Sequence, residues 1–162
     1  MVETASKNQI LFARLVIVLM IAFAVFGAVW YGFSAEVRHR VWQQLIDRPT
    51  GPMAFRFVLQ PVMAAIAALR DGVKDAKSGR SPYFWTLLVN PLERFGRLNE
   101  GLISTARIIL LGLCMDVIYQ LIVLKTFYPG EAVIVATALA FVPYVLLRGP
   151  IARVARWRLG AV

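Results

Sequence analysis

Residues 15–34 read LVIVLMIAFAVFGAVWYGFS, twenty consecutive residues without a charged side chain. Two further apolar runs, residues 108–124 and 132–147, lie near the C-terminus and are joined by a short polar segment. A helix of about 17–25 apolar residues matches the thickness of a bilayer core. We therefore expect an integral membrane protein with a first span at residues 10–34 and a C-terminal hairpin of spans at residues 104–124 and 132–147.

Composition supports the membrane class and limits the domain count. The hydrophobic fraction is 59% and the charged fraction 17%, whereas soluble domains are about 45–50% apolar and about 25% charged. With 162 residues, the chain has room for one helical bundle, so we expect a single membrane domain over residues 1–162. The net charge of +9 comes from basic residues that flank apolar runs, which indicates membrane anchoring and not nucleic acid binding.

The chain has one cysteine and one histidine, Cys114 and His39. This excludes an intrachain disulfide, a CxxC site and a zinc site built from histidines. We expect Cys114 to be a small buried residue and His39 to lie at the surface. No nucleophile–base pair and no glycine-rich phosphate loop is visible, so we predict neither enzymatic activity nor a cofactor.

Residues 53–69 are ambiguous, because Arg56, Gln60 and Pro61 interrupt an otherwise apolar segment. The segment either crosses the membrane or forms a re-entrant or interfacial helix. With four spans and both termini inside, thirteen Lys and Arg residues lie inside and five outside; with three spans and the N-terminus outside, the division is fifteen to three. The positive-inside rule mildly favours the second arrangement, whereas the apolar length favours crossing. Both place the C-terminus and residues 70–103 in the cytoplasm.

Between the second and third apolar segments, residues 70–103 are predicted to be cytoplasmic or interfacial. Apolar residues from Phe84 to Leu98 recur at helical spacing, which predicts an amphipathic helix in the membrane plane with a kink at Pro91. A shorter amphipathic piece is expected at residues 37–46. Asp71 and Asp75 lie four residues apart near lysines, and we interpret them as a solvated helix end.

Small residues at four-residue spacing indicate close helix packing within lipid. Three sets show this pattern: Ala24, Ala28 and Gly32; Ala64, Ala68 and Gly72; and Ala132, Ala136 and Ala140. Together they favour a tightly packed bundle or a helix-mediated oligomer.

Asp116 is the sharpest candidate for a functional residue, since it lies near the middle of the predicted span 104–124. A charge at such a depth costs at least about 2.5 kcal/mol. Tyr119 and Gln120 share its helix face. We expect a hydrogen bond between Asp116 and Gln60, with Tyr144 joining, and a protonated Asp116 that donates. The cluster either stabilises the bundle or provides a proton or cation site on a transport path.

The C-terminal segment is basic. The sequence Arg148-Gly149-Pro150 is expected to end the last span. The arginines at 148, 153, 156 and 158 are predicted to contact anionic lipid headgroups, because each basic residue near such a surface contributes about 1 kcal/mol. The predicted anchors are Arg148, Arg153, Arg156 and Arg158.

The chain resembles a group of short bacterial inner-membrane proteins. The residues that carry the resemblance lie between Arg56 and Arg153: Gln60-Pro61, Asp71-Gly72, Asp75-Ala76, Gly79-Arg80, Pro82-Tyr83, Asp116, Tyr119-Gln120, Phe127-Tyr128-Pro129, Glu131-Ala132, Val142-Pro143-Tyr144 and Arg148-Gly149-Pro150. The resemblance implies the bacterial inner membrane as the location, and it implies no activity, cofactor or partner.

The sequence is consistent with two functions. In the first, the chain is an interaction or accessory subunit that packs against itself or a larger membrane complex, with residues 70–107 as a docking surface. In the second, it is a small oligomeric channel or transporter whose path is lined by Asp116, Tyr119, Gln120 and Gln60. In both cases the expected partners are the lipid bilayer and its anionic headgroups, and no nucleic acid.

Overall fold

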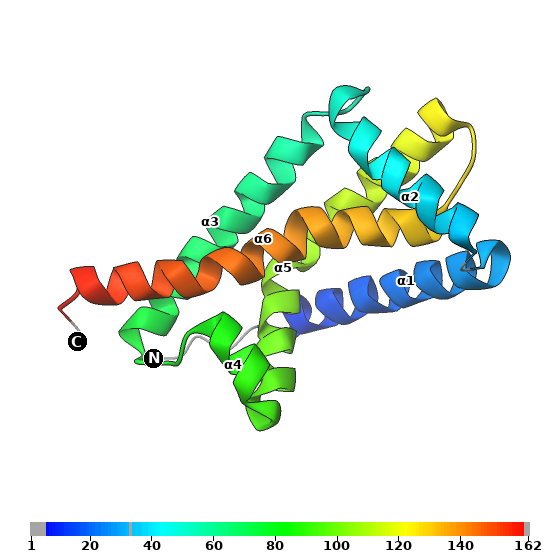
Figure 1. The fold of residues 1–162 in the computed structure, drawn as a ribbon. Coiled ribbons are helices and arrows are strands. Elements are labelled where there is room, and N and C mark those ends of the chain that lie inside the picture. Colours follow the sequence, from blue (N-terminus) through cyan, green and yellow to red (C-terminus); the bar gives the residue numbers. More distant parts are fainter. Residues whose placement is uncertain (1–5, 33, 161–162) are drawn as a thin grey trace.

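The computed structural model describes residues 6–32 and 34–160, and the secondary structure in these ranges is helical (Figure 1). In chain order the elements are α1 (Lys7–Tyr31), α2 (Ala35–Asp47), the 3₁₀ turn η1 (Arg48–Thr50), α3 (Arg56–Lys77), α4 (Tyr83–Val89), α5 (Pro91–Tyr119), the π-helical turn η2 (Gln120–Leu124) and α6 (Pro129–Arg158). The predicted all-α class is confirmed.

Three helices are long and apolar enough to cross a membrane: α1, the continuous rod of α5 and η2, and α6. Helix α3, which contains the ambiguous residues 53–69 in part, is not among them. Its 22 residues include charged side chains near both ends, from Arg56 to Lys77. By length and composition alone, the described helices therefore give three candidate spans, and whether α3 also crosses is not decided by this criterion.

The core of the bundle lies between α3 and α6. The predicted stripe Ala64, Ala68 and Gly72 is buried on α3, and the stripe Ala132, Ala136 and Ala140 is buried on α6. These two helices form the most extensive contact among the described elements, and α5 packs against both. Small side chains allow such close approach, which favours helix association where water cannot drive it.

Helix α1 packs against α5 and α6 through a face that the sequence pattern did not predict. Of the expected stripe, Ala24 and Gly32 are exposed. The close contact is made by Gly27, where an added Cβ would lie 2.7 Å from the backbone nitrogen of Gly130. This stripe therefore does not pack within the chain, and the contact is made by Gly27 on the adjacent side of the helix; its predicted role in a helix-mediated oligomer stays a prediction.

Prolines lie at the start of α5 and inside α6, and two predictions about them are wrong. Pro91 is the first residue of α5, so the expected single amphipathic helix is divided into α4 and the start of α5. Proline fits this position because its missing N–H would have no partner there. Helix α6 continues through Pro143 and Pro150 to Arg158 and does not end at Arg148-Gly149-Pro150.

The outer surfaces of the long helices are apolar. Exposed large hydrophobic residues are found on every long helix, including Val18 and Val29 on α1, Val62 on α3 and Leu146 on α6. Cys114 belongs to this outer surface and is exposed, which contradicts the prediction that it is buried. His39 is exposed as expected.

The crossing of α1 and α6 gives a testable consequence. Gly27→Ala should lower the unfolding temperature in detergent, because the new methyl group would overlap the backbone of Gly130 and must separate the helices. Gly96→Ala is the matched control, since no atom lies within 4 Å of its added Cβ; a helical Gly-to-Ala change there should stabilise by about 0.5–1 kcal/mol. Equal effects at the two positions would contradict the close crossing.

Candidate functional site

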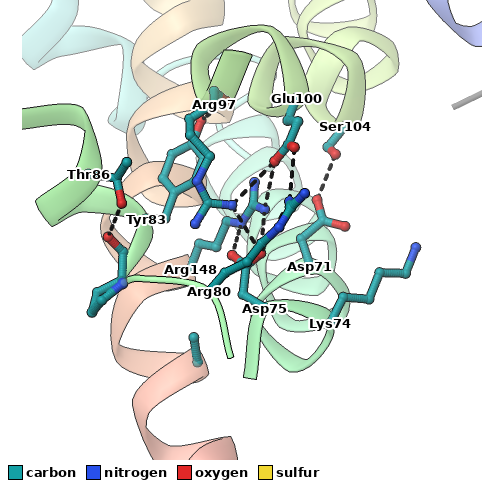
Figure 2. Close-up of polar contacts among 12 residues, drawn as sticks. Asp71, Lys74, Asp75, Arg80, Tyr83, Thr86, Arg97, Glu100, Ser104 and Arg148 are labelled. Atoms are coloured by element: carbon teal, nitrogen blue, oxygen red, sulfur yellow. Dashed lines mark hydrogen bonds and ion pairs between the residues drawn. The ribbon is translucent and has the colours of Figure 1, made fainter. Parts of the chain in front are cut away.

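Polar side chains from α3, α4, α5 and α6 meet at one end of the bundle (Figure 2). We call this group the Asp75 cluster; it comprises Asp71, Asp75, Arg80, Tyr83, Arg97, Glu100, Ser104, Tyr144 and Arg148. The sequence places these residues up to 77 positions apart, and the packing of α3 on α6 brings them together.

Asp75 is the centre of this cluster and is only 2% exposed. Arg148 donates to it twice, from Nε to Oδ2 at 2.8 Å and from Nη2 to Oδ1 at 3.0 Å. Arg97 donates from Nη1 to Oδ1 at 3.1 Å. A two-point contact between guanidinium and carboxylate is among the strongest ion-pair geometries, so one carboxylate links α3 to both α5 and α6.

Glu100 forms the water-facing edge of the cluster, with 39% of its side chain exposed. It accepts from Arg80 Nη1 at 3.0 Å, from Arg148 Nη2 at 3.3 Å and from Arg97 Nη1 at 3.4 Å. The same arginines therefore bridge a buried carboxylate, Asp75, and a half-exposed one.

Two tyrosines cover the buried side. The Arg148 guanidinium lies 4.2 Å from the ring centroid of Tyr83, a cation–π distance. The Tyr144 hydroxyl accepts from Arg148 Nη1 and donates to Asp71 Oδ2, both at 2.7 Å. Ser104 donates to the same Asp71 oxygen at 2.6 Å.

Burial sets the acidity of Tyr83, which lies on α4 outside the long apolar helices. Its hydroxyl donates to the backbone carbonyl of Arg97 at 2.7 Å. Burial raises the pKa of Tyr83 from 10.0 to about 12, against the opposing effect of the positive charges on Arg148 and Arg97. Tyr83 therefore remains a neutral donor over the whole physiological pH range.

The Asp75 cluster is balanced in charge, since it contains three arginines and three carboxylates, of which Asp75 and Glu100 form the ion pairs. Buried ion pairs contribute little net stability compared with apolar packing, but removing one partner strands the other and costs about 3–5 kcal/mol. We therefore expect the cluster to contribute more to the choice of helix partners and register than to net stability.

A second polar group, which we call the Asp116 cluster, lies toward the opposite ends of the same helices. It comprises Arg56, Asp116, Tyr119, Gln120 and Tyr128. Asp116 Oδ1 accepts from Arg56 Nη1 at 2.7 Å, and Oδ2 accepts from Gln120 Nε2 at 2.6 Å. The Arg56 guanidinium also lies 4.8 Å from the Tyr119 ring centroid. Arg56 and Asp116 are 1% and 0% exposed, respectively.

Gln120 extends the Asp116 cluster to the following loop. Its amide donates to the carbonyl of Tyr128, and its carbonyl accepts from the Tyr128 backbone N–H. Gln120 begins the π-helical turn η2. A π turn inside a helix is frequently found at a functional position, and here it coincides with the residue that joins Asp116 to the start of α6.

Arg40 of α2 forms a further contact at this end. Its Nε lies 3.3 Å from Glu131 Oε1, and its guanidinium lies 4.0 Å from the Tyr128 ring centroid. Tyr31, at the end of α1, donates to the carbonyl of Phe127 at 2.7 Å. Both contacts attach the first two helices to the beginning of α6.

Between the two clusters the interior is mostly apolar. Sixteen residues of α5 separate Glu100 from Asp116, about 24 Å of helix axis. Ala64, Ala68, Ile109, Leu113 and Ala136 fill the interval and are at most 1% exposed. Buried polar side chains are few in this interval among the described residues.

Gln60 and Thr137 are the polar side chains of this interval without partners. Gln60 is 1% exposed, and neither atom of its amide has a hydrogen bond. An added Cβ on Gly112 would lie 3.1 Å from Gln60 Nε2, so the amide fits against the glycine backbone. The Thr137 hydroxyl is likewise buried and unbonded.

The predicted intramembrane cluster is therefore corrected in its partners. The prediction of a bond between Gln60 and Asp116 is wrong, because Arg56 occupies the position beside the carboxylate. Tyr144 belongs to the Asp75 cluster and does not join Asp116. Asp116 accepts through both oxygens, so the expectation that it donates is also wrong. Its proximity to Gln120 is confirmed.

The predicted lipid anchors divide into two kinds. Arg148 is 3% exposed and bound to Asp75, so its prediction as a headgroup anchor is wrong. Arg153 and Arg158 are exposed, and Arg156 is partly buried with Nε directed to the Ala152 carbonyl. The interpretation of Asp71 and Asp75 as a solvated helix end is also wrong.

Arg56, Arg97 and Tyr83 were not identified as site residues from the sequence. A signal existed for Arg56: the series 56, 60, 64, 68, 72 repeats every four residues and forms the buried face of α3. Arg97 and Tyr83 carry no comparable local signal, because their partners come from other helices.

The chemistry of these groups is that of ion pairing. Among the described residues, no three His, Cys, Asp or Glu side chains are arranged to hold a metal ion. The carboxylates are committed to arginines and to hydroxyl donors. The arrangement can orient and fasten helices.

No family model, curated protein or solved structure matches this chain.

Removing the central carboxylate tests the Asp75 cluster. Asp75→Asn should destabilise the protein by up to about 3–5 kcal/mol, because it leaves two buried guanidinium groups with the half-exposed Glu100 as their remaining charge partner; thermal unfolding in detergent measures this. Glu93→Gln, which removes an exposed acid of α5, should change little. Combining Asp75→Asn with Arg148→Gln should cost less than the sum of the single variants, and strict additivity would refute the pairing.

The ionisation of Tyr83 gives a pH prediction. The difference in absorbance at 295 nm between wild type and Tyr83→Phe should titrate near pH 12. Because an exposed tyrosine loses its proton near pH 10, the stability contributed by this group is present below pH 10 and is lost as the pH rises to 12. A midpoint near 10 would show that Tyr83 is solvated.

Proposed function

We propose that the chain is a small integral membrane protein that serves as an interaction or accessory subunit, and that α3 crosses the membrane as a fourth helix. Helix α3 runs from the Asp116 cluster to the Asp75 cluster, as α6 does. Its outward residues Val58, Val62, Ile66 and Leu69 are 49–67% exposed and apolar. The buried charged side chains of α3 lower the mean hydropathy of this helix, and ion pairs within the bundle compensate these charges.

Tryptophans support this orientation of the bundle relative to lipid. Trp30 and Trp42 lie at the Asp116 end and are 70% and 67% exposed. Trp85 and Trp157 lie at the Asp75 end and are 62% and 77% exposed. Exposed aromatic residues at both ends of a bundle are typical of the two membrane–water interfaces.

The distribution of basic residues supports a direction of insertion. By chain position, thirteen of the eighteen Lys and Arg residues belong to the Asp75 end and five to the Asp116 end. Under the positive-inside rule the Asp75 end, with the end of α6, faces the cytoplasm. Together with the resemblance given by the sequence, this supports a multi-pass protein of the bacterial inner membrane.

The main observation that supports the proposed role is that packed side chains fill the interior of the bundle. Both clusters bind their own members, and alanine, isoleucine and leucine side chains fill the interval between them. A bundle of this kind presents its outer faces to partners. The clearest candidate surface for a partner is the start of α5 at the cytoplasmic end, where Leu92 and Phe95 are 95% and 79% exposed.

A small channel or transporter is the second candidate, and one observation favours it. The unbonded amide of Gln60 lies beside Gly112 in the apolar interval, where a water molecule would satisfy it. Because Asp116 is fully buried within its own bundle, such a path would run through the single chain.

The size of the particle and its conductance test the proposal. Gentle extraction from the native membrane should give a particle heavier than one 18.1 kDa chain, measured by light scattering. Leu92→Ser with Phe95→Ser should reduce its mass, whereas Leu121→Ser with Ile122→Ser, exposed at the other end, should not. A lone chain would overturn the accessory role. Solute flux in liposomes that exceeds background and falls in Asp116→Ala would favour the channel.

A further inference from the structure

Three arginines face outward from three different long helices. They are Arg14 on α1, Arg70 on α3 and Arg107 on α5, and all three are exposed. None of their side chains has a hydrogen bond or ion pair to any described residue. They contrast with Arg56, Arg97 and Arg148, which are buried and bound to carboxylates.

Arg70 and Arg107 lie at nearly the same level along the bundle. The Ser104 hydroxyl is 2.6 Å from Asp71 Oδ2, which places these two residues side by side. Arg70 precedes Asp71, and Arg107 follows Ser104 by one helical turn, about 5 Å of rise.

Arg14 reaches the same level from the other side. Helices α1 and α6 run in opposite directions and touch at Gly27 and Gly130 (Figure 1). Arg14 lies thirteen residues back along α1, about 20 Å of helical rise, and Tyr144 lies fourteen residues forward along α6, about 21 Å. Because the two helices are antiparallel, these similar rises place the two residues at similar levels. Tyr144 in turn donates to Asp71.

The three arginines are distributed around the bundle. Helices α1 and α3 each pack on α5 and α6, with little contact between α1 and α3. A protein partner would require the guanidinium groups on one shared face. Lipids surround a bundle on all sides, so a distributed set of arginines is better matched by lipid.

We propose that Arg14, Arg70 and Arg107 form a girdle that binds the phosphate groups of anionic phospholipids in the cytoplasmic leaflet. This inference rests on the proposed membrane insertion and names a lipid partner for it. A guanidinium on a long side chain can reach from an apolar helix face to the headgroup level and binds phosphate through two parallel hydrogen bonds. An exposed charge with no protein partner is unfavourable in hydrocarbon, and a phosphate removes that cost.

The lipid class follows from the local charge. The exposed residues of this end include Lys7, Lys77, Arg153 and Arg158 in addition to the girdle, whereas Glu93 is the one fully exposed acid there among the described residues. This excess favours a headgroup with net negative charge, such as phosphatidylglycerol, over a zwitterionic one.

Lipid selectivity at the protein surface tests the girdle. The full chain is reconstituted in phosphatidylcholine vesicles with spin-labelled phosphatidylglycerol or spin-labelled phosphatidylcholine, and the motionally restricted fraction is measured by electron paramagnetic resonance. The wild type should prefer phosphatidylglycerol about fivefold at the sites that the arginines form, the factor expected for one basic residue near an anionic surface.

The decisive comparison uses two triple variants with the same loss of charge. Arg14→Gln/Arg70→Gln/Arg107→Gln should reduce the preference to near unity, whereas Lys7→Gln/Arg153→Gln/Arg158→Gln should keep most of it. Equal reduction in both would show general charge attraction and overturn the girdle, as would no preference in the wild type. Flotation of the wild type with the vesicles is scored separately: failure to float overturns the proposed membrane insertion, whereas flotation without lipid preference overturns the girdle alone.

Discussion

The carboxylate of Asp75 determines how this bundle is assembled. It is buried at the end of α3 and accepts hydrogen bonds from Arg148 of α6 and Arg97 of α5. A buried charge without a partner is too unfavourable to persist, so packings of these three helices that separate the three side chains are excluded. Alanine stripes then allow the helices to approach, but alanine alone does not select a register. The ion pairs supply that selection.

A second constraint of the same kind at the other end makes the arrangement rigid. Arg56 and Asp116 join the start of α3 to the end of α5, and Arg40 with Glu131 joins α2 to α6. The two ion-paired clusters, separated by about 24 Å of helix, define both the relative position and the relative rotation of α3, α5 and α6. The apolar interval between them needs only to fill space, which small and branched aliphatic side chains do.

Much of the fold could be predicted from the sequence, because the patterns that indicate it involve residues close together in the chain. The apolar runs and the stripes Ala64–Gly72 and Ala132–Ala140 depend on residues a few positions apart. The contacts of the site could not be predicted in the same way. Asp75 and Arg148 are 73 residues apart, and within its own segment each resembles a solvent-exposed charged residue. The partner of Asp116 was also predicted wrongly. Asp116 lies in the middle of an apolar run, but Arg56 of another helix forms the contact with its carboxylate. The two prolines differ in position: Pro91 is the first residue of α5, where proline fits for a local reason, and α6 continues through Pro150 to Arg158.

The separation of Asp75 from Arg148 along the chain has a consequence for biogenesis. During synthesis α3 emerges before α5 and α6, while Arg56 and Asp75 still lack their counterions. A polar segment of this kind enters hydrocarbon poorly by itself. If α3 crosses the membrane as proposed above, its stable integration requires Arg148 of α6 as the counterion of Asp75. Under that proposal we expect α3 to integrate together with α6, so that the order of membrane integration would differ from the order of synthesis.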